Sequence, residues 1–115
     1  MGTWGTGLFQ DDIAVEIREA FESALKEGLG VAAATRQTLA DFADVFADKD
    51  DQIVAYLALA SLQLRRKAVQ PAVRRKVLSI LTKGLDLKRW EGRNSADFRR
   101  RQRVLERLHQ RLNHD

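Results

Sequence analysis

Residues 52–64 read QIVAYLALASLQL, a mostly apolar segment that carries no charge. Its apolar residues fall on nearly every side of a helix: Ile53, Val54, Tyr56, Leu57, Leu59, Ala60, Leu62 and Leu64. A helix that is apolar all round is buried among other elements. The stretch is also shorter than the roughly 20 residues that cross a bilayer. We therefore expect a central, buried helix.

Two amphipathic segments precede this stretch. The first begins at Asp11 or Asp12, either of which can cap its free N–H groups, and ends near Gly28. Its apolar residues recur at helical spacing, namely Ile13, Ile17, Ala20, Phe21, Ala24 and Leu25. The second segment runs from about residue 31 to residue 46. Both are expected to be helices that pack an apolar face on the central one.

Turn signals divide the rest of the chain. The sequence DKDD (48–51) separates two helices, and Asp50 or Asp51 can cap the central helix. The link RRKAVQ (65–70) leads to Pro71, which suits a first helical turn because its missing N–H costs no hydrogen bond there. That helix should end before Gly84. We expect LDLKRWEGRN (85–94) to be a connector that holds Trp90.

The last segment is a basic amphipathic helix over residues 95–112, capped by Asn94 or Ser95. One face carries Phe98, Val104, Leu105, Leu108 and Leu112, and the opposite face carries Arg99, Arg100, Arg103, Arg107 and Arg111.

Arg101 lies on the apolar face of this segment, where an unpaired guanidinium would be costly. Its stem can cover apolar surface while the charged end reaches water. Alternatively, an acid from the first 60 residues pairs with it. We favour the second solution, with either of the first two helices as the source of the acid.

The whole pattern predicts an all-α fold: a single domain (1–115) of about five helices around a buried central helix. An irregular arm rich in glycine and tryptophan (1–10) precedes the helices, and Trp4 should be buried against the first and central helices. The sequence has no cysteine, which excludes disulfides, thiolate nucleophiles and cysteine zinc sites. With no secretory pattern at the start, we expect a cytoplasmic protein that does not enter membranes.

Charge is distributed unevenly along the chain. Residues 1–60 hold four basic and eleven acidic residues, a net charge of −7. Residues 61–115 hold sixteen basic and five acidic residues, a net charge of +11. The two halves can pack together and neutralise each other, or the basic half can form a surface for an acidic partner.

No motif predicts catalysis, a metal site or a cofactor. Glu106 and His109 form one Glu-x-x-His pair, but a carboxylate-bridged metal bundle needs two such pairs and only one further histidine exists. Asp48, Asp50 and Gln52 match the start of a calcium loop, which then lacks its glycine and its final glutamate. We expect a protein that is not an enzyme.

The opening Met-Gly-Thr-Trp-Gly-Thr-Gly-Leu-Phe, followed by acids, resembles a bacterial family of small proteins of unknown function that begins Met-Gly-x-Trp-Gly-x-Gly-x-Phe. The matching residues are Gly2, Trp4, Gly5, Gly7, Phe9, Asp11 and Asp12. The likeness continues through EGLGVAAAT (27–35), YLALASLQL (56–64) and LDLKRWEG (85–92), whereas Gln10 departs from the pattern. The resemblance implies a compact bacterial domain, and some similar proteins are encoded among toxin–immunity genes.

These observations favour a protein-interaction module that acts by surface recognition. One such module would be a protein that resembles an immunity protein and binds a toxin. The alternative is a nucleic-acid-binding regulator that uses the basic half. In both cases Arg100, Arg103, Arg107 and Arg111 are the candidate partner-binding residues, because arginines three or four apart stack on one helical face. The sequence leaves the oligomeric state open.

Overall fold

The computed structural model describes residues 7–92 and 95–114, and every regular element in these residues is an α-helix. The all-α prediction is therefore confirmed. The described residues form seven helices rather than about five: α2 (Asp12–Lys26), α3 (Val31–Asp41), α4 (Ala43–Ala47), α5 (Asp51–Arg65), α6 (Pro71–Lys83), α7 (Leu85–Lys88) and α8 (Ser95–His114).

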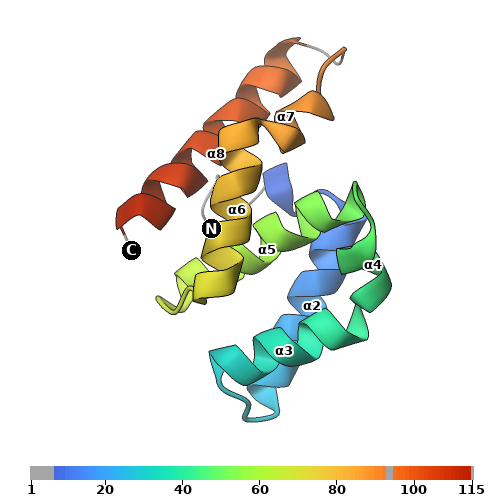
Figure 1. Ribbon diagram of the computed structural model, residues 1–115, viewed down its shortest axis with the longest axis vertical. Coiled ribbons are helices and arrows are strands. Elements are labelled where there is room, and N and C mark those ends of the chain that lie inside the picture. Colours follow the sequence, from blue (N-terminus) through green and yellow to red (C-terminus); the bar gives the residue numbers. More distant parts are fainter. Residues whose placement is uncertain (1–6, 93–94, 115) are drawn as a thin grey trace.

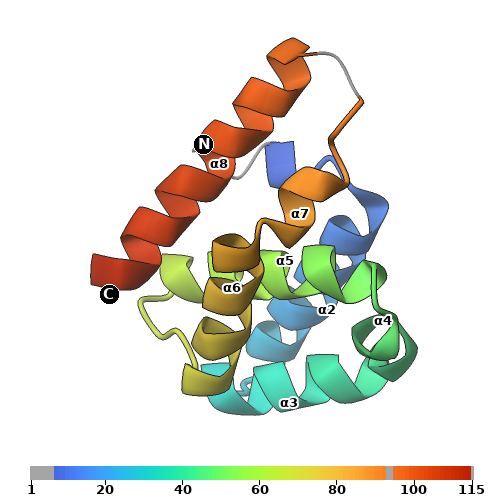
Figure 2. The same cartoon turned by 45° about the horizontal axis from the view of Figure 1, so that its top comes forward.

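The segment predicted to be the central helix forms α5, and most of its residues are buried. Leu57 and Leu59 are fully buried. Helices α2, α4, α6, α7 and α8 all contact α5, which runs through the middle of the molecule (Figures 1 and 2). The expectation of a buried helix over residues 52–64 is confirmed, because a segment that is apolar on all sides needs neighbours on all sides.

Helix α2 begins as predicted. The carboxylate of Asp11 accepts a hydrogen bond from the Ile13 N–H at 2.8 Å, which caps one of the free donors of the first turn. Ile17 and Phe21 are buried, one helical turn apart. The acids Glu16 and Glu19 are exposed on the other side.

The second predicted helix, over residues 31–46, is wrong as a single element. The backbone of Phe42 leaves helical geometry, with φ −115° and ψ 35°, and separates α3 from α4. The change of direction lets α4 pack on α5, where the rings of Phe46 and Tyr56 meet edge to face at 4.9 Å. An aromatic contact of this kind is worth about 0.5–1.5 kcal/mol beyond its buried area.

Asp50 occupies the N-cap position of α5, as predicted, but neither Asp50 nor Asp51 caps the helix with its side chain. Instead Asp48 Oδ1 accepts hydrogen bonds from the N–H groups of Asp50 and Asp51, both at 2.8 Å. The segment DKDD (48–51) contains three acids that could accept these hydrogen bonds. The geometry of the turn places the first of them, Asp48, at the N–H groups.

The link between α5 and α6 is held by a buried amide. Gln63 donates from Nε2 to Thr35 Oγ1 on α3 at 2.7 Å, and its Oε1 accepts from the Gln70 N–H at 2.9 Å. Pro71 then begins α6 as predicted, and Gly84 ends it in the left-handed conformation with φ 65°. The predicted connector after Gly84 contains one more helical element, α7.

Helix α8 begins at Ser95, and the other candidate cap, Asn94, lies outside the described residues. It packs chiefly against α5, α6 and α7. Leu108 and Leu112 are fully buried there. At its other end, Arg74 Nη1 of α6 donates to the carbonyl oxygen of Leu112, which places a cation at the negative end of the helix dipole.

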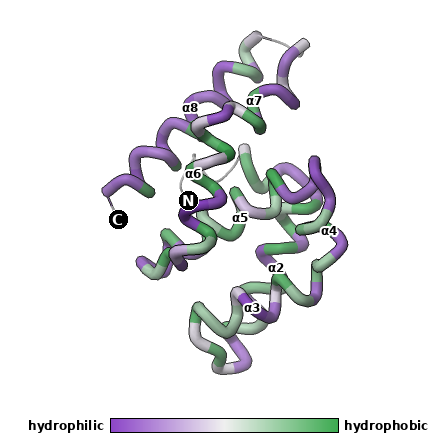
Figure 3. The backbone as a smooth tube through the Cα atoms, viewed as in Figure 1, coloured by the Kyte–Doolittle hydropathy of each residue, from purple (hydrophilic) through white to green (hydrophobic). Residues whose placement is uncertain are grey.

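The acidic half of the chain does not cover α8. Helices α2, α3 and α4 lie on the other side of α5 (Figure 1), and hydrophilic residues run along α8 (Figure 3). Of the two alternatives for the uneven charge, packing of the acidic helices against the basic C-terminal helix is therefore not the one found. Apolar contacts with α5, α6 and α7 hold α8 in place.

Only part of the predicted arm is described. Gly7 and Leu8 are helical, Phe9 and Gln10 form a turn, and Leu8 is fully buried. Residues 7–10 are thus not irregular throughout. Gly2, Trp4 and Gly5 lie outside the described residues, as does the expected burial of Trp4.

Candidate functional site

The arginine flank of α8, defined here as Arg100, Arg103, Arg107 and Arg111, is exposed along the whole helix. These residues are three or four positions apart and therefore stack on one side. The buried residues Val104, Leu105, Leu108 and Leu112 define the inward side, roughly a third of a turn around the helix from the flank. The sequence prediction of one cationic face and one apolar face is confirmed.

The side of α8 away from the arginine flank faces α6 and α7. A shallow groove of about 110 Å³ separates α8 from α6 and α7, and it is lined on the α8 side by Gln102, Leu105, Glu106 and His109. At 100° per residue, the four arginines project away from this groove. Glu106, an exposed acid on the groove side, follows Arg103 by three residues and therefore lies beside that arginine of the flank.

One arginine of the flank has an acidic neighbour on its own helix. Arg100 Nη1 lies 3.5 Å from Asp97 Oδ1, with side-chain exposures of 77 % and 49 %. Exposed pairs of this kind contribute only about 0–1 kcal/mol. An acidic partner can therefore replace Asp97 at little cost.

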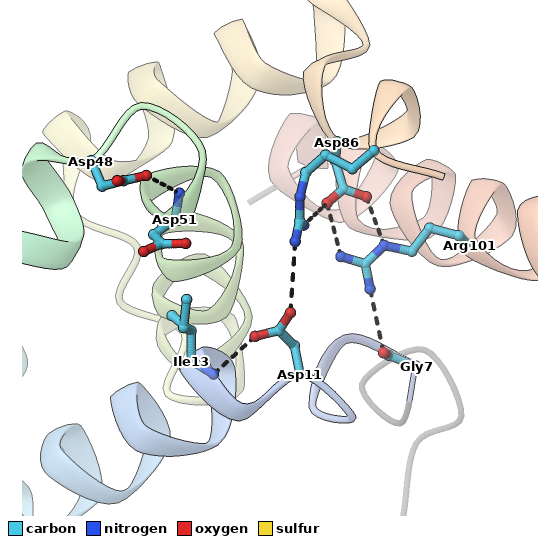
Figure 4. A network of polar contacts seen from close by, with 8 residues as sticks. Gly7, Asp11, Ile13, Asp48, Asp51, Asp86 and Arg101 are labelled. Atoms are coloured by element: carbon cyan, nitrogen blue, oxygen red, sulfur yellow. Dashed lines mark hydrogen bonds and ion pairs between the residues drawn. The ribbon is translucent and has the colours of Figure 1, made fainter. Parts of the chain in front are cut away.

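Arg101 is buried on the inward side and is bound by an acid that the sequence reasoning missed. Its Nε donates to Asp86 Oδ2 at 2.6 Å, and its Nη2 donates to Asp86 Oδ1 at 2.9 Å. Its third nitrogen, Nη1, donates to the Gly7 carbonyl at 3.3 Å. Figure 4 shows this guanidinium between α7 and the N-terminal segment. The expected partner from the first 60 residues is wrong, because Asp86 lies on α7.

Arg89 extends the charge network to α2. Its Nη1 lies 3.2 Å from Asp86 Oδ1, and its Nη2 lies 3.7 Å from Asp11 Oδ2. The same Asp11 caps α2 (Figure 4). The residues Asp11, Arg89, Asp86 and Arg101 thus form a chain of alternating charges that joins the start of α2, the helix α7 and the middle of α8. Each buried charge in this network has an opposite charge beside it.

A cavity of about 270 Å³ adjoins this network and is lined by Gly7, Gln10, Asp11, Arg89, Trp90 and Arg101. Its volume is just below the range of about 300–1,000 Å³ that is usual for ligand pockets. Its two arginines are already bound to Asp86 and Asp11, and the Arg101 guanidinium lies 5.2 Å from the Trp90 ring. The arrangement serves to fix α7 and α8 rather than to present a free charge.

The described residues of the family motif have structural roles. The Gly7 carbonyl accepts from Arg101, and the Phe9 ring lies 5.1 Å from the Arg18 guanidinium. Asp11 is both helix cap and partner of Arg89, whereas Asp12 is exposed. The signal that could have found Asp86 was Arg101 itself, since an arginine on an apolar face requires an acid.

Within residues 7–92 and 95–114, no three histidine or acidic side chains gather as a metal ion would require. Glu106 and His109 line the groove beside α6. The buried hydroxyl of Ser61 has no hydrogen-bond partner among the described residues. In the part of the chain that the structure describes, no helix is both long enough and apolar enough to pass through a bilayer.

Comparison of the chain with protein-family models, with curated proteins and with solved structures finds no match. The residues and their geometry are therefore the basis for assigning a function.

Proposed function

We propose that this chain is a cytoplasmic bacterial binding module that recognises an acidic macromolecular partner by surface contact. The arginine flank of α8 is the binding surface. The required negative charge can come from an acidic protein, as in recognition by an immunity-like protein. It can also come from a nucleic acid. The resemblance of the opening segment to small bacterial proteins agrees with a module of this kind.

The single observation that carries the proposal is the separation of the two faces of α8. The inward face is buried in the core, and its one charged residue, Arg101, is bound by Asp86. The arginine flank projects away from α6 and α7 and is exposed. A run of exposed arginines, on the side of α5 away from the acidic helices, is typical of a surface that meets an opposite charge.

The experiment compares the wild type with the fourfold variant R100E/R103E/R107E/R111E as immobilised baits. Lysate is passed over each bait, with and without nuclease. We expect the wild type to enrich acidic proteins or nucleic acid that the variant does not retain. Identical retention by the two baits would contradict the proposal. A thermal melt of each bait controls for folding, and the melts should agree within a few degrees because the exchanged residues are exposed.

A further inference from the structure

We infer that the acidic partner is the phosphate backbone of a nucleic acid, bound with little base readout. The inference rests on the proposed function and deepens it, because it names the class of partner. Three features of α8 and its surroundings favour phosphate over an acidic protein surface.

The exposed side of α8 lacks an apolar anchor. Its exposed residues are Ser95, Ala96, Arg99, Arg100, Gln102, Arg103, Glu106, Arg107, Gln110, Arg111, Asn113 and His114. Protein interfaces are centred on buried aromatic or aliphatic side chains that supply most of the binding energy. Phosphate contacts need only cations and hydrogen-bond donors, which this side has.

The flank also has the length and rigidity that a charged backbone requires. α8 comprises 20 residues, which gives it a length of about 30 Å, and Arg100 to Arg111 span about 16 Å of it. A duplex presents about ten phosphate charges over 16 Å. The helix is fixed at both ends of this span, by the Arg101–Asp86 pair and by the contact of Arg74 with the Leu112 carbonyl.

Further cations lie near the C-terminal half of α8. The link between α5 and α6 is close to this end of α8 in both views (Figures 1 and 2). Arg66 and Lys67 of the link are exposed. Base readers are sparse by comparison, because Gln110 is the amide nearest the flank and Gln102 borders the groove. We therefore expect binding that depends on charge and length but little on base sequence.

The test measures fluorescence anisotropy of labelled 20-base-pair DNA duplexes of two unrelated sequences at several salt concentrations. Phosphate contacts from the four flank arginines contribute about −3.6 to the slope of log K against log salt, and contacts from Arg66 and Lys67 add up to about −1.8. The variant R100Q/R103Q/R107Q/R111Q should lose most of this slope and at least tenfold in affinity at low salt. R66Q/K67Q should reduce the slope by up to about 2.

The matched control, K26Q/R36Q/K49Q/K83Q, removes the same amount of charge from exposed positions elsewhere. It should bind within about twofold of the wild type. An equal loss in this control would show that net charge alone drives binding and would overturn the inference. A preference of tenfold or more for one duplex would overturn the expectation of little base readout.

Poly-glutamate of similar length distinguishes this inference from the proposed function. We expect weaker binding to poly-glutamate than to DNA at equal salt. If poly-glutamate binds as well or better, and this binding depends on the arginine flank, the nucleic-acid inference fails while the binding module stands. If neither DNA nor poly-glutamate binds, and the wild-type and variant baits retain the same material from lysate, the nucleic-acid inference and the proposed function both fail.

Discussion

Single residues decide how α8 is attached to the domain. The sequence shows that Arg101 interrupts an apolar face, which left two solutions: a charged end that reaches water, or the favoured pairing with an acid. The identity of the partner was not predictable, because Asp86 belongs to a four-residue helix with no periodic signal. The acid-rich first half was the reasonable source by composition, yet a local acid only 15 residues away provided the pair.

Replacing Asp86 with Asn should destabilise the protein strongly. Arg101 is only 4 % exposed. Removal of the Asp86 carboxylate leaves this buried charge without compensation, which should lower the free energy of unfolding by about 3–5 kcal/mol. Urea unfolding followed by circular dichroism measures the loss. The double variant D86L/R101M removes both charges and should recover much of it. If the free energy of unfolding of D86N lies within 1 kcal/mol of the wild type, the Asp86–Arg101 pair is not needed for stability. The variant D12N, which changes an exposed acid, serves as the control.

Asp48 should make the stability of the turn before α5 dependent on pH. Hydrogen bonds from the backbone N–H groups of Asp51 and Asp50 lower the pKa of its carboxyl below the ordinary value of 3.8. A lowered folded-state pKa stabilises the fold above the unfolded value, and this contribution is lost as the pH falls through the folded value. Melting temperatures between pH 6 and pH 2 should therefore fall less in D48N than in the wild type.

Asn serves in this comparison because its side-chain oxygen still accepts the two hydrogen bonds but carries no charge. D48A, which cannot accept them, should melt lower than D48N at every pH. If D48A and D48N melt together at pH 6, the side chain of Asp48 does not stabilise the turn.

At the scale of elements, prediction succeeded where pattern and packing agree. α5 followed from its apolar composition, and α6 followed from Pro71 and Gly84, which are local signals. The division between α3 and α4 was missed because the apolar spacing continues through Phe42. Tertiary contact of α4 with α5 breaks the helix there, and no residue such as proline or glycine marks the position.

Removal of α8 should uncover the core. A chain that ends at Gly92 lacks the buried side chains Val104, Leu105, Leu108 and Leu112 and leaves Asp86 without Arg101. We expect a loss of at least about 3 kcal/mol in the free energy of unfolding, with binding of a dye that reports exposed apolar surface. The fourfold arginine-to-glutamine variant should show neither effect. A truncated chain as stable as the full one would mean that α8 contributes only its surface.

For the molecule as a whole, the charge split along the chain becomes a split in space. The acidic helices α2 to α4 and the basic helix α8 lie on different sides of α5 (Figure 1). Composition alone predicted the asymmetry but not its arrangement, since mutual neutralisation of the two halves was the favoured expectation. The three-dimensional separation produces a field that orients the protein toward a negatively charged surface before contact.

The hydrogen bond from Arg101 to the Gly7 carbonyl joins residues 94 positions apart. It therefore sets an order of events during protein synthesis. At about 5–20 residues per second, Arg101 is made roughly 5–20 seconds after Gly7 and about 1–3 seconds after Asp86. Helices α2 to α5 can pack on one another in that interval, and Arg89 can pair with Asp86 and Asp11 as soon as α7 is made. The pair between Arg101 and Asp86 forms last, so a nascent chain that stalls before α8 holds Asp86 through Arg89 alone.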